Sequence, residues 1–174
     1  MTDAMERKDA LPETAAVCGL YCEACSLFIA SHEDPERLKL LAAMFGMTAE
    51  QIACDGCRSD KHGPYCMTCK MKPCAEEHGV SFCGECAEYP CETLKAFQCE
   101  RPHRRDLWKD LERIRDIGYD AWSKEARKAY ECPGCGAVNS AYDLKCRSCG
   151  REPSCGYVER HGAAVREFLA AAKK

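Results

Sequence analysis

The pair Cys-x-x-Cys recurs along this sequence and constrains the fold more than any other feature. Two residues between cysteines let one tight turn direct both sulfurs at one ion, so such pairs are typical of metal sites. The pairs occupy positions 22/25, 54/57, 66/69, 83/86, 132/135 and 146/149. Because the chain has 17 cysteines, an odd number, no set of disulfides can include them all. Metal binding is therefore the first hypothesis for these sulfurs.

The compartment is inferred from what the sequence lacks. Residues 1–17 are polar and charged, with no apolar stretch of the signal-peptide type, and we expect a flexible N-terminus. No apolar run approaches the roughly 18 residues of a membrane span. We therefore expect a soluble, cytoplasmic protein without membrane contact, where close cysteine pairs more often bind metal than form disulfides. The apolar share of 46% counts every cysteine, so metal must supplement a modest core.

Charge is distributed unevenly between the two parts of the chain. Residues 1–100 carry 9 Lys and Arg against 17 Asp and Glu, and residues 101–174 carry 16 against 11. Zinc bound by four thiolates would add about two further negative charges per site to the first part. We therefore do not expect that part to have a strong non-specific affinity for nucleic acid, whereas the basic C-terminal half remains open to it.

The spacing of the cysteines divides the chain into segments. We predict a flexible N-terminus (1–17), a cysteine-rich metal-binding module (18–99), a helical connector (100–131), a zinc ribbon (132–152) and a C-terminal helix (153–174). The expected fold class is small α+β and metal-organised. It consists mainly of helices and loops, with short hairpins in the C-terminal four-cysteine zinc ribbon.

Helix boundaries are marked by capping residues. Asp34 and Pro35 suit the start of a helix that Gly46 ends, and Thr48 with Gln51 has capping-box spacing for a short helix after it. Further helices are predicted at residues 91–97, 103–117, 120–130 and 158–171, with loops at 55–90. The mixed charges of 103–117 indicate ion pairs within that helix.

The segment from Cys132 to Cys149 has the pattern of a zinc ribbon. Cys132-Pro-Gly-Cys135-Gly and Cys146-Arg-Ser-Cys149-Gly are both knuckle turns, each followed by the glycine that such a turn requires. Together they predict a closed four-sulfur site of structural type, with zinc as the expected ion. A rubredoxin-like iron site uses similar knuckles and stays open as an alternative.

The N-terminal cysteines are predicted metal ligands whose partners the sequence does not assign. They are Cys18, Cys22, Cys25, Cys54, Cys57, Cys66, Cys69, Cys74, Cys83, Cys86 and Cys91. These eleven are one short of three four-ligand sites, and Cys99, His78 or His103 is a candidate for a twelfth. The pairing of 54/57 with 66/69 is geometrically easy. The spacers Asp-Gly and Gly-Glu favour zinc, whereas the 18/22/25 triple and the sequence Tyr89-Pro90-Cys91 favour an iron–sulfur cluster.

Other chemistry has weaker support. The spacing of Cys18, Cys22 and Cys25 also occurs in radical-SAM enzymes, but those need a partial barrel, and a full barrel takes about 250 residues. We expect the remaining histidines on the surface or in loops, and Cys155 as a free thiol. The sequence has no recognisable catalytic triad, phosphate loop or paired-carboxylate motif.

A longer pattern carries a family resemblance. It runs from Cys18-Gly-Leu-Tyr-Cys22, through Cys54-Asp-Gly-Cys57, to Phe82-Cys83-Gly-Glu-Cys86-Ala-Glu-Tyr-Pro-Cys91, and continues into the ribbon cysteines. Over residues 18–150 the chain resembles a prokaryotic family of cysteine-rich proteins known only as a domain of unknown function. The resemblance implies a cytoplasmic bacterial or archaeal protein that binds metal, and it implies no reaction.

Three functional hypotheses follow. The leading one is a zinc-stabilised interaction module that binds a protein, or nucleic acid through its basic C-terminal half. The second is an iron–sulfur protein in electron transfer or redox sensing. The third is a metal-dependent enzyme or a metal sensor with an open coordination position.

Overall fold

The computed structural model describes residues 11–172, and this part of the chain is built from helices and loops. Its β-structure consists of two isolated bridges, Ala15 to Tyr21 and Glu131 to Val138. The α+β prediction is therefore wrong in its β part, because the loop after Glu131 is held by turns and not by a hairpin ladder. Within the described residues, no helix is long and apolar enough to cross a membrane.

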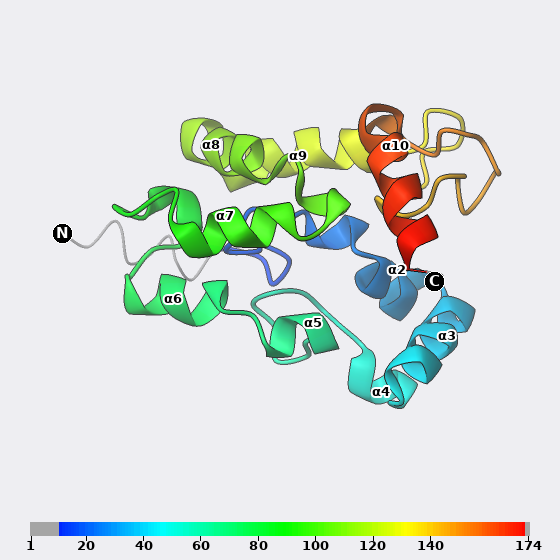
Figure 1. Cartoon of the computed structure of the whole chain (residues 1–174), viewed down its shortest axis with the longest axis horizontal. Coiled ribbons are helices and arrows are strands. Elements are labelled where there is room, and N and C mark those ends of the chain that lie inside the picture. Colours follow the sequence, from blue (N-terminus) through cyan, green and yellow to red (C-terminus); the bar gives the residue numbers. More distant parts are fainter. Residues whose placement is uncertain (1–10, 173–174) are drawn as a thin grey trace.

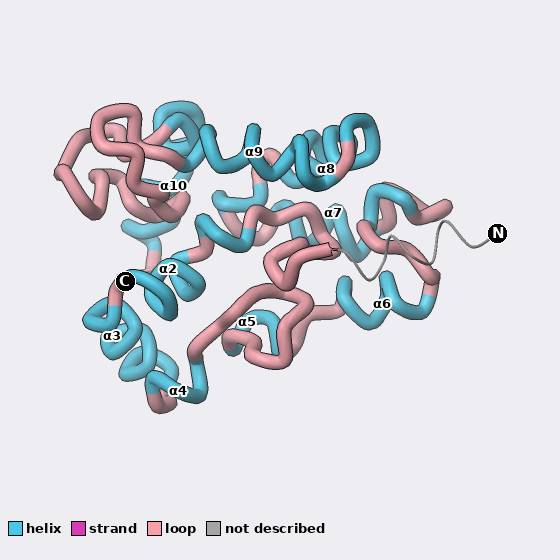
Figure 2. Tube along the Cα trace, turned by 180° about the vertical axis from the view of Figure 1, so that it is seen from behind, coloured by secondary structure: helices cyan, strands magenta, loops and turns pink. Residues whose placement is uncertain are grey.

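Figures 1 and 2 show the helices that make up most of the described chain. They are α2 (Ser26–Glu33), α3 (Pro35–Phe45), α4 (Ala49–Ile52), α5 (Pro64–Met67), α6 (Met71–Glu77), α7 (Glu92–Cys99), α8 (Leu107–Ile117), α9 (Tyr119–Tyr130) and α10 (Gly156–Ala171). Three short 3-10 helices join them: η2 (Cys22–Ala24), η3 (Cys83–Glu85) and η4 (Pro102–Arg104). In Figure 1, α8 and α9 form one edge of the molecule, and α4, α5 and α6 lie along the opposite edge.

The capping signals in the sequence predict two helices correctly. Asp34 caps α3 by accepting a hydrogen bond from the Arg37 amide at 3.0 Å, and Gly46 ends the helix in the left-handed conformation with φ 62°. Thr48 and Gln51 form both hydrogen bonds of the predicted capping box at the start of α4. The other predicted helices are present with shifted ends.

Three helices lie where the sequence did not indicate them. α2 was missed because its apolar residues fall on all its sides, so it lacks an amphipathic stripe. α5 and α6 lie inside residues 55–90, which we expected to be loops. Pro64 and Pro73 both fall in first helical turns, where a missing N–H breaks no helical hydrogen bond.

The predicted connector helix begins later than expected. Pro102 starts η4, and α8 begins only at Leu107. The charged side chains of this region also pair differently from the prediction. Arg113 donates to both Glu125 oxygens on α9, at 2.7 and 2.9 Å, and Asp106 binds His161 of α10 at 3.0 Å. The prediction of ion pairs within 103–117 is therefore wrong, because the charged groups of this segment pair with residues outside it.

An aromatic column connects the first cysteine motif to the C-terminal helix. Tyr21, between Cys18 and Cys22, packs edge-on against Trp122 and stacks on Tyr130, with ring centroids 6.1 and 5.9 Å apart. Tyr130 in turn stacks on Tyr157 of α10 at 5.0 Å. Tyr21, Trp122 and Tyr157 are buried. This motif tyrosine is therefore a core residue that anchors the cysteine loop.

Two glycines let α8 lie directly against the cysteine loops. A Cβ atom on Gly19 would lie 2.7 Å from Cγ of Leu111, and one on Gly84 would lie 3.1 Å from the Leu111 carbonyl oxygen. Leu111 is completely buried. The glycines inside the Cys18-Gly-Leu-Tyr-Cys22 and Cys83-Gly-Glu-Cys86 motifs are thus required by close packing.

We expect Gly19→Ala to destabilise the protein more than Gly46→Ala. Both positions have positive φ, 82° and 62°, so alanine should cost about 1–2 kcal/mol of backbone strain at either. Only Gly19 adds an overlap with a buried side chain, which should cost about 1–3 kcal/mol more. Urea unfolding of metal-loaded protein measures the difference. Equal losses would contradict the close packing of α8.

Candidate metal centres

The four C-terminal cysteines form a compact site. Their sulfur atoms all lie within 4.8 Å of one another. The Sγ atoms of Cys132 and Cys149 are 3.6 Å apart, as are those of Cys135 and Cys146. Four sulfurs in a tetrahedron with metal bonds of about 2.3 Å would be about 3.8 Å apart. The site therefore has the size that one tetrahedral ion requires, and its four cysteines are those that the sequence analysis grouped together.

Two similar turns place these sulfurs. The Gly136 amide donates to the Cys132 carbonyl at 2.8 Å, and the Gly150 amide donates to the Cys146 carbonyl at 2.9 Å. Both glycines have positive φ, 76° and 74°, which explains why each pair is followed by glycine. The Gly134 amide also points at the Cys132 sulfur, 3.4 Å away.

Asn139 supports the site and was missed by the sequence analysis. Its side chain is completely buried, and its amide nitrogen lies 3.6 Å from the Cys146 sulfur and 2.9 Å from the Ala137 carbonyl oxygen. Its side-chain oxygen accepts a hydrogen bond from the Arg147 amide at 2.9 Å. Nothing in the sequence marks an asparagine between two knuckles as a partner of sulfur.

The site cannot carry four negative sulfurs without a compensating charge. Burial would raise the pKa of Cys146, but hydrogen bonds from the Cys149 and Ser148 amides and from neighbouring thiols lower it to about 6. The Arg151 amide favours the thiolate of Cys149, yet its neighbours Cys132 and Cys135 raise its pKa to about 11. Cys146 therefore loses its proton readily, whereas Cys149 keeps its proton. A bound dication would favour the loss of both protons.

The segment that carries this site is bound to α2 and α3. Arg37 of α3 donates to both oxygens of Asp143, at 2.9 and 3.2 Å. Ser26 of α2 shares a hydrogen bond with Ser140 at 2.7 Å, and Arg147 forms an ion pair with Glu33 at the end of α2. The C-terminal site is therefore fixed against the helices that follow the first cysteine motif.

The N-terminal cysteine loops converge on residues 15–17. Arg58 donates to the carbonyl oxygens of Ala15 and Ser81, at 2.7 and 2.6 Å. The Cys83 amide donates to the Val17 carbonyl at 2.8 Å. One arginine side chain thus joins the segments that carry Cys18, Cys57 and Cys83.

The largest sulfur–sulfur effect on the pKa of each shifted cysteine defines three groups, and smaller effects also act between the groups, such as those of Cys25 on Cys22 and of Cys57 on Cys66. The first group is Cys18, Cys22, Cys57 and Cys69; the second is Cys25, Cys54 and Cys66; the third is Cys74, Cys83, Cys86 and Cys91. Burial, followed by the thiolates of Cys57 and Cys69, raises the pKa of Cys18. Burial and, to a smaller extent, the negative charges of the Cys54 and Cys25 thiolates raise the pKa of Cys66 to about 12.

This grouping differs from the easiest pairing in the sequence. In 22/25, 54/57 and 66/69, one cysteine falls in the first group and the other in the second. The pairing of 54/57 with 66/69 on one ion stays a prediction, since Cys54, Cys57 and Cys69 all act on the pKa of Cys66. The pair 83/86 stays together in the third group.

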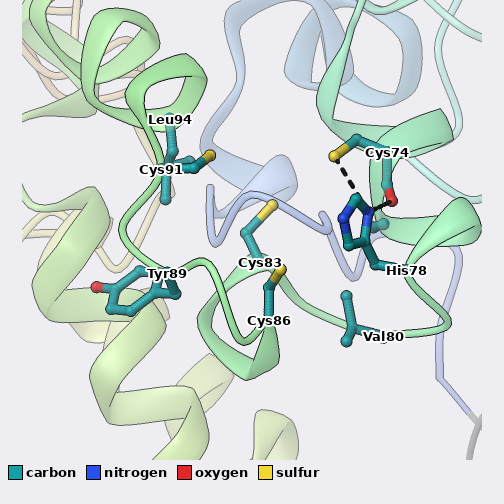
Figure 3. A pocket seen from close by; sticks show the side chains of 9 residues that line it. Cys74, His78, Val80, Cys83, Cys86, Tyr89, Cys91 and Leu94 are labelled. Carbon is teal, nitrogen blue, oxygen red and sulfur yellow. Dashed lines mark hydrogen bonds between the residues drawn. The ribbon is translucent and has the colours of Figure 1, made fainter.

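The third group surrounds a cavity between α6, η3 and α7. Figure 3 shows the sulfurs of Cys74, Cys83, Cys86 and Cys91 directed toward the same space. The cavity is also lined by apolar side chains, among them Leu94. His78 lies at its edge, with Nδ1 2.9 Å from the Cys74 carbonyl oxygen and 3.7 Å from its sulfur.

The three N-terminal groups are wider than the C-terminal site. Within residues 11–172, the C-terminal cysteines are the one set of three or more Cys, His, Asp or Glu ligand atoms that all lie within 4.8 Å of one another. No three of the eleven N-terminal sulfurs meet that limit. The structure thus contains cysteine sites of two different sizes.

The remaining candidates lie apart from these groups. His103 shares a hydrogen bond with Tyr142 at 2.6 Å and belongs to none of the three groups, and burial lowers its pKa to about 3. Cys99 is exposed at the end of α7. Cys155 is buried beside Tyr157, and the Ser154 hydroxyl lies 3.6 Å from its sulfur.

The fold and the sulfur sites define a helical, cysteine-rich protein with at least one site suited to a metal ion. Residues 14–96 match the model of a family described as a protein of unknown function (DUF3795). The match supports the predicted resemblance to a family of unknown function over part of residues 18–150, and it ends before the C-terminal site. No curated protein and no solved structure matches the chain.

We expect loss of the Asn139 amide to weaken metal binding at the C-terminal site. Groups that hydrogen-bond to metal ligands typically contribute about 10- to 100-fold to affinity. Asn139→Ala should lower the affinity for added Zn²⁺ by this factor, measured by competition with a chelator. Asn139→Asp is the isosteric control, because it keeps the acceptor for Arg147 and removes the N–H. Unchanged affinity in both variants would show that the contact with Cys146 contributes nothing.

Proposed function

We propose that the C-terminal four-cysteine site is a structural zinc ribbon and that the protein is a zinc-stabilised binding module. The observation that carries this proposal is the spacing of the four sulfurs, with two pairs 3.6 Å apart and all within 4.8 Å. Four thiolates at this spacing suit zinc, and they leave no coordination position for water or substrate. The ion therefore stabilises structure and does not catalyse a reaction.

The ion would order a segment that has few other means of holding its shape. Apart from the bridge of Glu131 to Val138, no strand pairing supports residues 131–155 in the described chain. Binding of structural zinc contributes about 10–16 kcal/mol in peptide models. That contribution would hold Asp143 and Arg147 in place for their contacts with α3 and α2.

We propose a protein and not a nucleic acid as the partner. Several basic side chains of the C-terminal half are already paired with carboxylates: Arg113 with Glu125, Arg127 with Glu131, Arg147 with Glu33 and Arg160 with Asp106. Paired arginines contribute little to a phosphate-binding surface, because phosphate would have to displace the carboxylate. The net positive charge of residues 101–174 thus overstates the charge available to a nucleic acid.

A second function is favoured by the wide spacing of the N-terminal sulfurs. An iron–sulfur protein in electron transfer or redox sensing would use such groups, because a cluster separates its cysteine ligands. The third hypothesis, an open site for catalysis or metal sensing, has less support. In the part of the chain that the structure describes, no histidine or carboxylate joins two cysteines within 4.8 Å.

We expect Cys149→Ala to remove one zinc ion per chain and to loosen the C-terminal segment. Elemental analysis should show the loss, and hydrogen exchange should become faster across residues 131–155. Cys99→Ala is the matched control, because Cys99 is equally exposed and lies outside every group. If both variants keep the zinc content of the wild type, the ribbon proposal fails.

We also expect no mobility shift of non-specific duplex DNA or RNA at low salt, about 50 mM. The physical reason is that carboxylates already neutralise Arg113, Arg127, Arg147 and Arg160, which lowers the positive charge available to phosphate. A shift that disappears as salt is raised would instead establish nucleic acid as the partner. An Arg113→Ala variant would then identify whether the surface of α8 is responsible.

A further inference from the structure

We propose that Cys74, Cys83, Cys86 and Cys91 form the binding site of a four-iron iron–sulfur cluster. This site is separate from the zinc ribbon and does not depend on it. Its ligands come from three elements: Cys74 from α6, Cys83 and Cys86 from the two ends of the η3 turn, and Cys91 from the N-cap position of α7.

The first argument is the direction of the four side chains. Figure 3 shows their sulfurs facing one space between α6, η3 and α7, although Cys74 and Cys91 are far apart in sequence. η3 is fixed on both sides of its turn. The Cys83 amide binds the Val17 carbonyl at 2.8 Å, and the Cys86 amide binds the Cys83 carbonyl at 3.2 Å. The two sulfurs of this pair therefore sit on a rigid turn at one side of the cavity.

The second argument is the separation of the sulfurs. Two ligands on one zinc ion cannot be farther apart than twice the bond length, about 4.6 Å. In residues 11–172, no three sulfurs of this group all lie within 4.8 Å of one another. Any three of them therefore include at least one pair that is farther apart than 4.8 Å. As placed, three of them cannot bind a single zinc ion. The four C-terminal sulfurs do lie within 4.8 Å of one another. The sulfur–sulfur distances therefore differ between the two sites of this chain.

A four-iron cluster accommodates this separation. Each cysteine binds a different iron atom, and the inorganic sulfides of the cluster fill the space between them. Four cysteines around one cavity supply the four ligands that such a cluster requires. Zinc at this site would instead require the sulfurs to move together.

The third argument is the surroundings of the cavity. Its walls include Ala75, Val80 and Leu94, which are apolar, and Leu94 is 1% exposed. Such walls leave the sulfurs few groups to stabilise a thiolate. Ligation to iron would supply the positive charge that these sulfurs lack.

His78 acts on the cluster from outside the ligand set. Its Nδ1 lies 2.9 Å from the Cys74 carbonyl oxygen, and a carbonyl can only accept, so Nδ1 carries the proton. The same N–H lies 3.7 Å from the Cys74 sulfur. This nitrogen is therefore a donor to a ligand and not itself a ligand. Hydrogen bonds to cluster sulfurs are one means by which proteins adjust reduction potential.

The test is the iron and sulfide content of full-length protein purified without oxygen. We expect the wild type to contain iron and acid-labile sulfide in equal amounts, and its iron X-ray absorption to show an iron–iron shell. Cys91→Ala should lose about four iron and four sulfide per chain and keep its ribbon zinc. Cys99→Ala, which changes a cysteine of the same helix outside the group, should keep both.

Each result supports or overturns the proposal. Wild-type protein that contains zinc but no iron, or iron without an iron–iron shell, overturns it while leaving the ribbon proposal intact. Iron retained in both Cys91→Ala and Cys86→Ser also overturns it. If Cys91→Ala does not fold, the wild-type iron–iron shell and the iron content of Cys86→Ser decide. Conversely, loss of iron in these variants with no zinc in the wild type supports the cluster and refutes the zinc ribbon.

Discussion

The mutual repulsion of closely placed thiolates is the constraint on which the rest of this structure depends. All fifteen predicted ligand cysteines fall into groups where burial or neighbouring sulfurs act on the pKa of at least one member. Their protons must leave for the sulfurs to bind anything, and only bound cations make that loss favourable. The helices alone form a limited core, so the cations and the packing of α8 on the cysteine loops have to act together. Gly19 and Gly84 show how closely α8 packs on the cysteine loops, because a Cβ atom at either position would lie too close to Leu111.

The Cys-x-x-Cys pair is used in two ways within one chain. In the C-terminal site both sulfurs of each pair lie in the same compact tetrahedron, as in a knuckle. In the N-terminal part, 22/25, 54/57 and 66/69 each divide between two groups. The pair 83/86 stays in one group, although η3 lies between its cysteines just as η2 lies between Cys22 and Cys25. Spacing in the sequence therefore indicates metal binding but does not say which cysteines share a metal.

The sequence predicted features set by local rules and missed those set by tertiary contacts. Asp34, Gly46 and Thr48 act on their own helix ends, so the bounds of α3 and α4 could be predicted. The C-terminal ligands could be predicted because two adjacent turns contain all of them. α2 could not, since its burial depends on packing partners distant in sequence. The role of Asn139 and the division of the N-terminal cysteines depend on which loops meet, which pairwise spacing does not encode. The ribbon hairpins were predicted from the usual form of such sites, and the described chain has a single bridge there.

α2 provides a physical connection between the C-terminal site and the N-terminal cysteines. Cys25 occupies its N-cap position, and the Ser31 hydroxyl accepts a hydrogen bond from the Cys54 amide at 3.0 Å. The same helix contacts the C-terminal segment through Ser26 and Glu33. An ion that fixes the C-terminal segment would therefore also fix the helix that positions Cys25 and Cys54. This coupling does not reach all groups equally. The second cysteine group depends on α2, whereas the cysteines of the third group lie on α6, η3 and α7. Metal occupancy of the C-terminal site should thus affect the second group more than the third.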